Sequence, residues 1–292
     1  MSALIQTIRF LFSHPLARRS RWAALKRFVT WQIASRVLPH PVIHPFVGTT
    51  RLIVEKGMTG ATGNIYTGLH EFEDMAFLLH FLRSEDLFAD IGANIGSYTV
   101  LAGGVVNCRV FSAEPVPATF NHLHDNVLIN HLSEKVLLCN AGIGAETGRL
   151  SFTRSLDTTN HVAVAGEKDT IEVPVTLLDE AIGETPRLIK IDVEGFEMAV
   201  LQGAKRILSD THLKALIVEI NQSCIRYGHT PEEVHGLLVG YGFTSYQYEP
   251  FGRALTPTDG PGKQNTIYLR DPDFATQRVH SAEKVQVLGQ QF

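Results

Sequence analysis

The chain lacks several features that mark other protein classes. It has only three cysteines in 292 residues, Cys108, Cys139 and Cys224, and none of them forms a C-x-x-C pair. This spacing excludes a disulfide framework and a four-cysteine metal site, and it favours a reducing compartment. No apolar run approaches the ~18 residues of a membrane span. With 44% hydrophobic and 19% charged residues, we expect a soluble, cytoplasmic globular protein rather than a disordered chain or a coiled coil.

Acidic residues are absent from the first 54 positions, where eight basic residues occur. Apolar residues recur there at roughly helical spacing, which predicts a basic amphipathic helical extension over residues 1–55. Such a helix can contact a membrane surface or another anionic surface through residues 1–36, or it can pack as a flap on the acidic body. Nucleic-acid binding is not expected, because the acidic body would repel phosphate.

Strand patterns and helix patterns alternate through the middle of the chain. We expect strands at 87–91, 109–113, 136–140, 188–191, 215–220, 243–249 and 265–270, and main helices at 71–82, 119–132, 196–208 and 231–241. This alternation predicts an α/β fold with a doubly wound, mostly parallel sheet, whose last two strands could pair antiparallel. The domain should span 56–272, beginning with a Gly/Thr-rich connection at 57–68 and followed by a C-terminal tail at 273–292.

The residues just after the strands are the candidates for function. In a doubly wound sheet, ligands bind beyond the carboxyl ends of the strands, at the point where strand order reverses. Four of these positions carry acids, namely Asp90, Glu114, Asp192 and Glu219. We therefore expect the site to be rich in carboxyl groups.

A glycine-rich turn, D-I-G-A-N-I-G, runs from Asp90 to Gly96. Glycines at Gly92 and Gly96 permit a tight turn and close approach of the backbone to a ligand. Glu114 lies at the end of the next strand, where an acid can accept hydrogen bonds from a ribose, as in dinucleotide sites. Asn94 stands where the dinucleotide fingerprint has glycine, and Asp90 would repel a pyrophosphate. The pattern therefore favours the cationic S-adenosylmethionine (SAM) over NAD, and an NAD-dependent oxidoreductase ranks last.

Longer stretches closely resemble the FkbM family of SAM-dependent methyltransferases. They are F-A-D-I-G-A-N-I-G-S-Y-T at 88–99, S-A-E-P-V-P at 112–117, L-I-K-I-D-V-E-G-F-E at 188–197 followed by L-Q-G-A, and V-E-I-N at 218–221. The resemblance implies a class I methyltransferase (Rossmann-like) fold with a seven-stranded sheet. It also implies S-adenosyl-L-methionine as cofactor and, usually, O-methylation of a hydroxyl on a sugar or secondary metabolite.

By motif position, the resemblance also implies cofactor contacts. They lie in the glycine-rich turn and at the ends of the next two strands. The implied contacts are Asp90, Gly92, Ala93, Asn94 and Gly96 at the methionine end of SAM, Glu114 and Pro115 at its ribose, and Asn140 and Ala141 near its adenine.

Candidate catalytic residues follow the fourth core strand. Asp192 should lie beside the methyl donor, with Glu194 on the neighbouring surface. Methyl transfer to an alcohol requires an aligned oxygen and a group that accepts its proton. Acids also favour helix N-termini, so Asp192 or Glu194 could instead serve as a helix cap. His161, in an irregular insertion, is another candidate base, and Glu71 should lie in the wall of the site beside the cofactor.

A metal site is the weaker interpretation of the acids. Asp192 with Glu219 and Asn221 could bind Mg²⁺ or Ca²⁺ through oxygen ligands, as in catechol-type methyltransferases. One acid at each strand end is common without a metal, so no metal is predicted.

The leading hypothesis is a SAM-dependent O-methyltransferase acting on a small-molecule or glycan acceptor, with N-terminal helices that cover the site or bind the acceptor. The alternative is a non-catalytic SAM-binding module anchored through its basic N-terminus to a partner or an anionic surface. The intact glycine turn and the acids at each strand end favour the enzyme.

Overall fold

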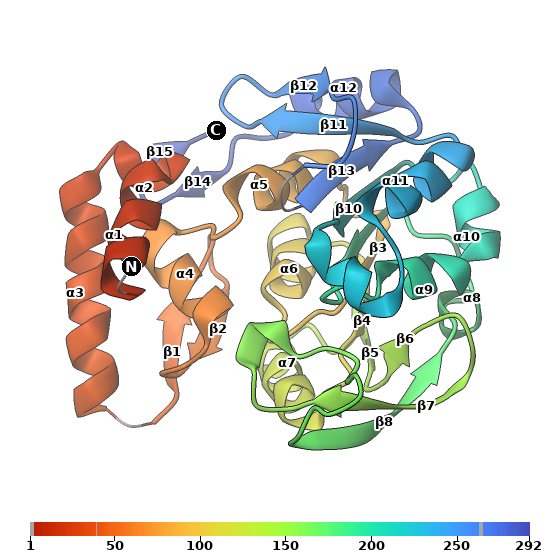
Figure 1. Ribbon diagram of the computed structural model, residues 1–292. Helices are drawn as coiled ribbons and strands as arrows, with labels where there is room; N and C mark the ends of the chain where they lie inside the picture. The colour runs from red at the N-terminus through yellow and green to blue at the C-terminus, as the bar shows by residue number, and fades with distance from the viewer. Residues whose placement is uncertain (1–2, 39, 263–264) are drawn as a thin grey trace.

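A computed structural model describes residues 3–38, 40–262 and 265–292 (Figure 1). At its centre is an eight-stranded sheet in the order β12-β11-β13-β10-β9-β3-β4-β5. The strands are β3 (Leu87–Ile91), β4 (Arg109–Ala113), β5 (Val136–Cys139), β9 (Leu188–Ile191), β10 (Ala215–Glu219), β11 (Thr244–Glu249), β12 (Ala254–Pro257) and β13 (Asn265–Leu269). The five strands from β10 to β5 are parallel, and the other three pair antiparallel.

This sheet confirms the predicted class I methyltransferase architecture and adds one strand to it. The last two predicted strands, β11 and β13, do pair antiparallel. The sheet has eight strands rather than seven because the chain turns back after β11 and forms β12. This edge strand is mostly exposed and ends in Pro257. It therefore lacks the apolar alternation by which a strand is recognised in a sequence.

Alternate residues of the buried strands contribute to two separate cores, as the two-residue period of a strand requires. Phe88 and Leu188 belong to the first core, and Ala89 and Ile189 belong to the second. The first core is covered by α5 (Phe72–Phe81), α6 (Ser97–Val100), the π-helical segment η1 (Leu101–Val106), α7 (Pro117–Ile129) and α12 (Pro272–Ser281), and the second by α8 (Leu178–Ala181), α9 (Glu197–Gln202), α10 (Lys205–Ser209) and α11 (Pro231–Gly240).

The N-terminal segment forms its own layer beside the sheet (Figure 1). It consists of α1 (Ala3–Ser13), α2 (Pro15–Arg18), α3 (Arg21–Val37) and a hairpin of β1 (Val42–Pro45) and β2 (Arg51–Val54). Asn126 joins this layer to the core. Its side chain accepts a hydrogen bond from Ile53 N at 2.7 Å and donates one to Ile95 O at 2.8 Å. No helix in the described part of the chain combines the length and apolar character needed to cross a membrane.

The Gly/Thr-rich stretch predicted as a connection contains a helix, α4 (Thr59–Thr67). Its small residues are needed for packing rather than for a turn, since a Cβ at Gly63 would lie 2.2 Å from Nδ1 of His70. The other side of α4 contacts α3, where Phe28 packs edge-on against Tyr66. The prediction of a connection at 57–68, made from glycine and threonine content, was therefore wrong. Packing against neighbouring elements stabilises a helix here despite the low helix propensity of these residues.

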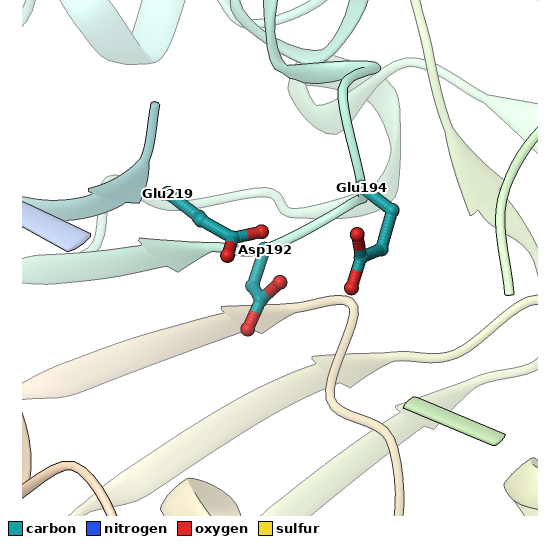
Figure 2. A group of neighbouring side chains, drawn as sticks. All are labelled: Asp192, Glu194 and Glu219. Carbon is teal, nitrogen blue, oxygen red and sulfur yellow. The ribbon is translucent and has the colours of Figure 1, made fainter. Parts of the chain in front are cut away.

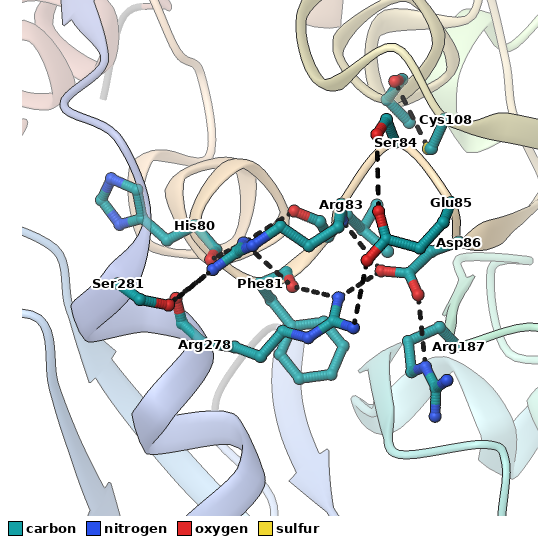
Figure 3. Close-up of polar contacts among 12 residues, drawn as sticks. His80, Phe81, Arg83, Ser84, Glu85, Asp86, Cys108, Arg187, Arg278 and Ser281 are labelled. Atoms are coloured by element: carbon teal, nitrogen blue, oxygen red, sulfur yellow. Dashed lines mark hydrogen bonds and ion pairs between the residues drawn. The ribbon is translucent and has the colours of Figure 1, made fainter.

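The C-terminal residues pack on the core. Asp86 accepts a hydrogen bond from Arg83 N at 2.8 Å and forms ion pairs with Arg278 of α12 and Arg187 (Figure 3). A short hairpin of β14 (Gln286–Val287) and β15 (Gln290–Gln291) follows, and the terminal Phe292 is buried. Residues 273–292 are thus tied to the body of the protein, while the division into three parts stays a prediction.

A second, three-stranded sheet lies between β5 and β9 in the sequence. It has the order β6-β8-β7, with β6 (Gly142–Ile143), β7 (Gly148–Thr153) and β8 (Thr170–Thr176). The loop between β7 and β8 contains the short 3₁₀ helix η2 (Asp157–Thr159). This loop, residues 154–169, is called the insertion below. Its η2 contacts α4.

Candidate active site

A cavity of about 270 Å³ lies at the carboxyl ends of β3, β4, β9 and β10. The strand order reverses between β3 and β9, because β3 leads to β4 and β5 on one side whereas β9 leads to β10 on the other. Gly92, just after β3, has a φ of +77°, and a Cβ there would lie 1.8 Å from the carbonyl oxygen of Asp192. Only glycine fits this crossing, which brings the chain ends of β3 and β9 together as the fold predicts.

The glycine-rich turn and Glu114 form one hydrogen-bonded unit. Asn94 has a φ of +51°, a conformation that asparagine tolerates better than most residues. Its backbone N–H donates to Oε2 of Glu114 at 3.1 Å, and Val116 N donates to Oε1 at 3.0 Å. Burial raises the pKa of Glu114 to about 7, although these two hydrogen bonds oppose the rise. Each carboxylate oxygen keeps a further lone pair for another donor.

The expected adenine residues stand beside the main cavity rather than in its wall. Asn140 donates through Nδ2 to the backbone oxygens of Glu114 and Pro115, at 2.8 and 3.2 Å, and so holds the end of β4. Ala141 lines a smaller void of about 20 Å³, to which Gly92 and Pro115 also contribute. This void adjoins the main cavity, since the two share four lining residues, Gly92, Pro115, Phe152 and Val193.

Asp90 lies at the floor of the cavity and is almost fully buried. The Thr99 hydroxyl donates to Oδ2 of Asp90 at 2.7 Å and lies 2.7 Å from the hydroxyl of Ser112. Burial raises the pKa of Asp90 to about 6, against the opposing charge of Lys190. This acid is therefore positioned by a short chain of hydroxyl groups.

Lys190 is a central residue that the sequence analysis missed. Its Nζ lies 2.6 Å from Oδ2 of Asp192 and 4.7 Å from the centre of the Tyr98 ring, and its side chain is nearly buried. Burial opposes its charge, but the carboxylates of Asp192, Glu71 and Asp90 raise its pKa. The sequence did contain a signal for it, a lysine inside the otherwise apolar strand L-I-K-I. Lysine is rarely fully buried without a partner, so a lysine in a buried strand indicates a nearby carboxylate.

Glu71 is held in the wall of the cavity. Its carboxylate accepts from the Tyr98 hydroxyl at 2.9 Å and from Nδ2 of Asn265 at 2.8 Å. The same Asn265 amide donates to Asp74 at 3.0 Å. Burial and the charge of Glu71 raise the pKa of Asp74 to about 7.

Three carboxyl groups meet at the ends of β9 and β10. Figure 2 shows Asp192, Glu194 and Glu219 turned toward one another, and their nearest oxygens lie within 4.8 Å. Burial and the charge of Asp192 raise the pKa of Glu194 to about 7. Burial, Asp192 and Glu194 raise that of Glu219 to about 9. The raised pKa of Glu219 favours its protonated form, which reduces the repulsion within the group.

The structure does not bring Asn221 together with Asp192 and Glu219 as a set of cation ligands. Asn221 uses its Oδ1 to accept from Ser223 N at 2.7 Å and so caps the 3₁₀ helix η3 (Gln222–Tyr227). Glu194 takes the third place beside Asp192 and Glu219. Carboxylate oxygens at such distances can share one proton or one cation.

His161 lies in the insertion, outside the wall of the cavity. Its Nδ1 is 2.7 Å from Thr159 O and its Nε2 is 2.9 Å from Oε1 of Glu167, so both ring nitrogens have partners. The neighbouring Thr158 and Asn160 line the cavity instead. The insertion therefore contributes its loop backbone and polar side chains to the site, with His161 as an internal tie.

The insertion and α4 meet beside the cavity. Thr59, Gly60 and Asn64 of α4 line one side, and Thr158 of the insertion lines the other. A Cβ at Gly60 would lie 3.6 Å from Cγ2 of Thr158, which is ordinary contact distance. The N-terminal segment is linked to the site through α4, on which α3 packs.

Comparison with known proteins finds methyltransferases. The sequence model of the methyltransferase FkbM domain matches residues 90–245, more than half of the chain. Hexuronic acid methyltransferase AglP of Haloferax volcanii is 29% identical over 172 residues, which cover 58% of this chain and 67% of that protein. Methyltransferase 1 of Beauveria bassiana is 28% identical over 182 residues, covering 52% and 71%. The crystal structure of methyltransferase FkbM from Methylobacillus flagellatus KT is 17% identical with a TM-score of 0.44, covering 85% of this chain and 60% of that one.

Proposed function

This chain belongs to the FkbM methyltransferase family, and we propose that it transfers the methyl group of SAM to a hydroxyl oxygen of a saccharide or a related metabolite. The observation that carries the proposal is Glu114, a buried carboxyl at the end of β4, joined to the glycine-rich turn at the rim of an acid-lined cavity. The arrangement combines a hydrogen-bond acceptor for a ribose with negative charge for a cationic ligand.

The residues of the cavity fit SAM in shape and in charge. Gly92 lines the cavity without a side chain, so the backbone of the glycine-rich turn borders the ligand space directly. The carboxyl groups of the wall outnumber its one lysine, Lys190, and they are Glu71, Asp90, Glu114, Asp192, Glu194 and Glu219. Bound there, SAM supplies a methyl group on a positively charged sulfur. Glu114 would accept from the ribose hydroxyls, and Asp90 and Glu71 would face the cationic methionine end.

Glu194 is the group that we assign as proton acceptor. A base works best when its pKa lies near the operating pH, and burial beside Asp192 raises that of Glu194 to about 7. Asp192, held by Lys190 at 2.6 Å, would orient the acceptor hydroxyl. His161 would act on Glu194 through its charge, which lowers the pKa of Glu194, and not as the base.

Three observations suggest the class of acceptor: the name of a relative, the polar lining of the cavity and the charge of the cavity. A saccharide is suggested by the relative named for hexuronic acid methylation. Threonine and asparagine side chains from α4 and the insertion line the cavity, and such groups hydrogen-bond well to sugar hydroxyls. The acids around them would repel a carboxylate, so an uncharged hydroxyl is the expected acceptor in this chain.

Calorimetric titration of the purified protein with SAM, and with NAD and ATP as controls, tests the cofactor. Selective binding of SAM is expected, and a folded sample that does not bind SAM would refute the cofactor assignment. The acceptor is tested by incubation with SAM carrying an isotopically labelled methyl group and a panel of neutral glycosides and uronic acids, read by mass spectrometry. Label on uronic carboxylates and on no hydroxyl would contradict the acceptor class.

A further inference from the structure

In the part of the chain that the structure describes, the cations of the N-terminal segment form no ion pair with a carboxylate. Eight basic residues and no acidic residue occur before position 55. Within residues 3–38 and 40–54, none of these cations forms an ion pair with a carboxylate. Arg27 donates to a backbone oxygen, Tyr66 O, and Arg19 lies over the ring of Phe251. The positive charge of this segment is therefore available to an external anion.

Large apolar side chains accompany these charges on the outer side of α3. Trp22 is 84% exposed, Ile33 is 59% exposed and Val37 is 70% exposed. Together with Lys26 and Val29 they recur at positions that share one face of a helix. We call this the α3 outer face, made of Trp22, Lys26, Val29, Ile33, Arg36 and Val37.

The opposite side of α3 supplies the contacts that hold the helix in place. Ala24, Phe28 and Trp31 are buried, and Phe28 packs against Tyr66 of α4. Figure 1 shows α3 at the edge of the molecule, separated from the central sheet by α1, α4 and the hairpin. Folding of the segment therefore does not explain the apolar residues on the α3 outer face.

We propose that the α3 outer face binds the surface of an anionic lipid bilayer. Interfacial helices combine an apolar stripe, often with tryptophan, and lysine or arginine beside it, and they lie in the plane of the membrane. Lys26 and Arg36 can reach headgroup phosphates while Trp22, Ile33 and Val37 enter the headgroup region. Two copies of this chain would oppose the same cations across a shared face, so charge complementarity favours an anionic surface over self-association.

The helix α3 is connected to the cavity through α4. Arg27 and Gln32 of α3 donate to the backbone oxygen and the hydroxyl of Tyr66 in α4, each at 2.9 Å. Thr59 and Asn64 of the same helix line the cavity. A bilayer on the α3 outer face would therefore be separated from the cavity by two packed helices, α3 and α4.

Sedimentation of the full chain with sucrose-loaded vesicles tests the proposal. We expect binding to phosphatidylcholine vesicles with about one third phosphatidylglycerol, weaker binding at high salt, and little binding to phosphatidylcholine alone. Each cation near such a surface contributes about 1 kcal/mol, so K26E/R36E should lower the partition coefficient by about thirtyfold or more. W22S/I33S should lower it by at least about tenfold.

A matched control comes from the far side of the molecule. V239S/K205E changes an exposed valine of α11 and an exposed lysine of α10, and it should bind vesicles like the wild type. Circular dichroism melting confirms that each variant folds. Equal binding to neutral and anionic vesicles, no binding at all, or wild-type binding by both α3 variants would overturn the proposal. A wild-type dimer that W22S/I33S converts to a monomer, without vesicle binding, would assign the face to self-association instead.

Discussion

Replacing Glu114 by glutamine isolates one charge in the proposed cofactor site. The carboxylate accepts two backbone N–H groups, from Asn94 and Val116, at 3.1 and 3.0 Å. Its remaining lone pairs are those that we assign to the ribose hydroxyls. Glutamine keeps the size of the side chain but replaces one acceptor oxygen with a donor, which must face either a backbone N–H or the ribose.

The expected loss follows from the strength of hydrogen bonds to charged groups. Such bonds contribute about 1.5–3 kcal/mol each. Losing about 2–3 kcal/mol raises the dissociation constant of SAM about 30- to 150-fold. The assay is calorimetric titration of E114Q and wild type, with the unfolding midpoint of each free protein measured first.

The pH dependence separates this role from a structural one. Burial raises the pKa of Glu114 to about 7, so in the free wild type the carboxyl must lose a proton before it can accept fully from the ribose. Affinity for SAM should therefore rise between about pH 6 and pH 8 and then level off, and E114Q should lose this step. E194Q is the matched control, because it removes another cleft carboxyl whose pKa is also about 7 and should keep the step. A wild-type dissociation constant for E114Q at high pH, or an unchanged step, would refute the ribose assignment.

Other predictions concern the base, the turn and stability. E194Q should lower kcat about 10²–10⁴-fold with little change in the affinity for SAM. H161A should keep the pH profile of a reaction limited by the base. If steady-state kinetics instead showed that H161A loses this profile and E194Q keeps it, His161 would be the base and not Glu194. G92A places a methyl group 1.8 Å from the Asp192 carbonyl oxygen, so it should cost about 1–3 kcal/mol or more in denaturant unfolding, whereas G236A, with no atom within 4 Å, should not destabilise. The carboxyl groups of the cavity have raised pKa values, so they bind more protons in the folded protein than in the unfolded chain. Burial lowers the pKa of His14 and of His80 to about 4, which has the opposite effect below about pH 6.5. The free energy of unfolding without SAM should therefore fall as pH rises from about 6.5 to 9, and a rise in thermal scans across that range would contradict the assignment.

The edge of the sheet at which the site lies could be predicted from the sequence. Each strand appears as an apolar run, and the acidic residue that follows marks where the strand ends. Asp90, Glu114 and Asp192 each follow an apolar run, and the fold brings those ends together. The ion pair between Lys190 and Asp192 could not be predicted in the same way. A buried lysine looks like a single interruption of an apolar strand, and its partners become visible only once β3 and β9 are neighbours.

Loops and packed small residues limited the prediction elsewhere. The orientation of His161 depends on Glu167 and Thr159, which follow no periodic pattern. The segment of α4 reads as a flexible connection because glycine and threonine have low helix propensity. It is a helix because those same residues let it pack between α3 and the cavity, with Gly63 against His70. Propensity describes the isolated chain, whereas this helix depends on its neighbours.

Charge is segregated in this protein, and the two proposals depend on that segregation in opposite ways. The net charge of −4 conceals a cavity whose carboxyl groups outnumber Lys190 and an N-terminal segment with cations only. The cavity should attract a cationic cofactor and repel an anionic acceptor, whereas the α3 outer face should attract an anionic surface. If the acceptor is itself bound to such a surface, its negative charge must lie in the part that stays at the membrane. The part that carries the reacting hydroxyl into the acidic cavity must be uncharged. Raising the ionic strength should therefore weaken vesicle binding and SAM binding alike, while a neutral soluble acceptor should keep its affinity.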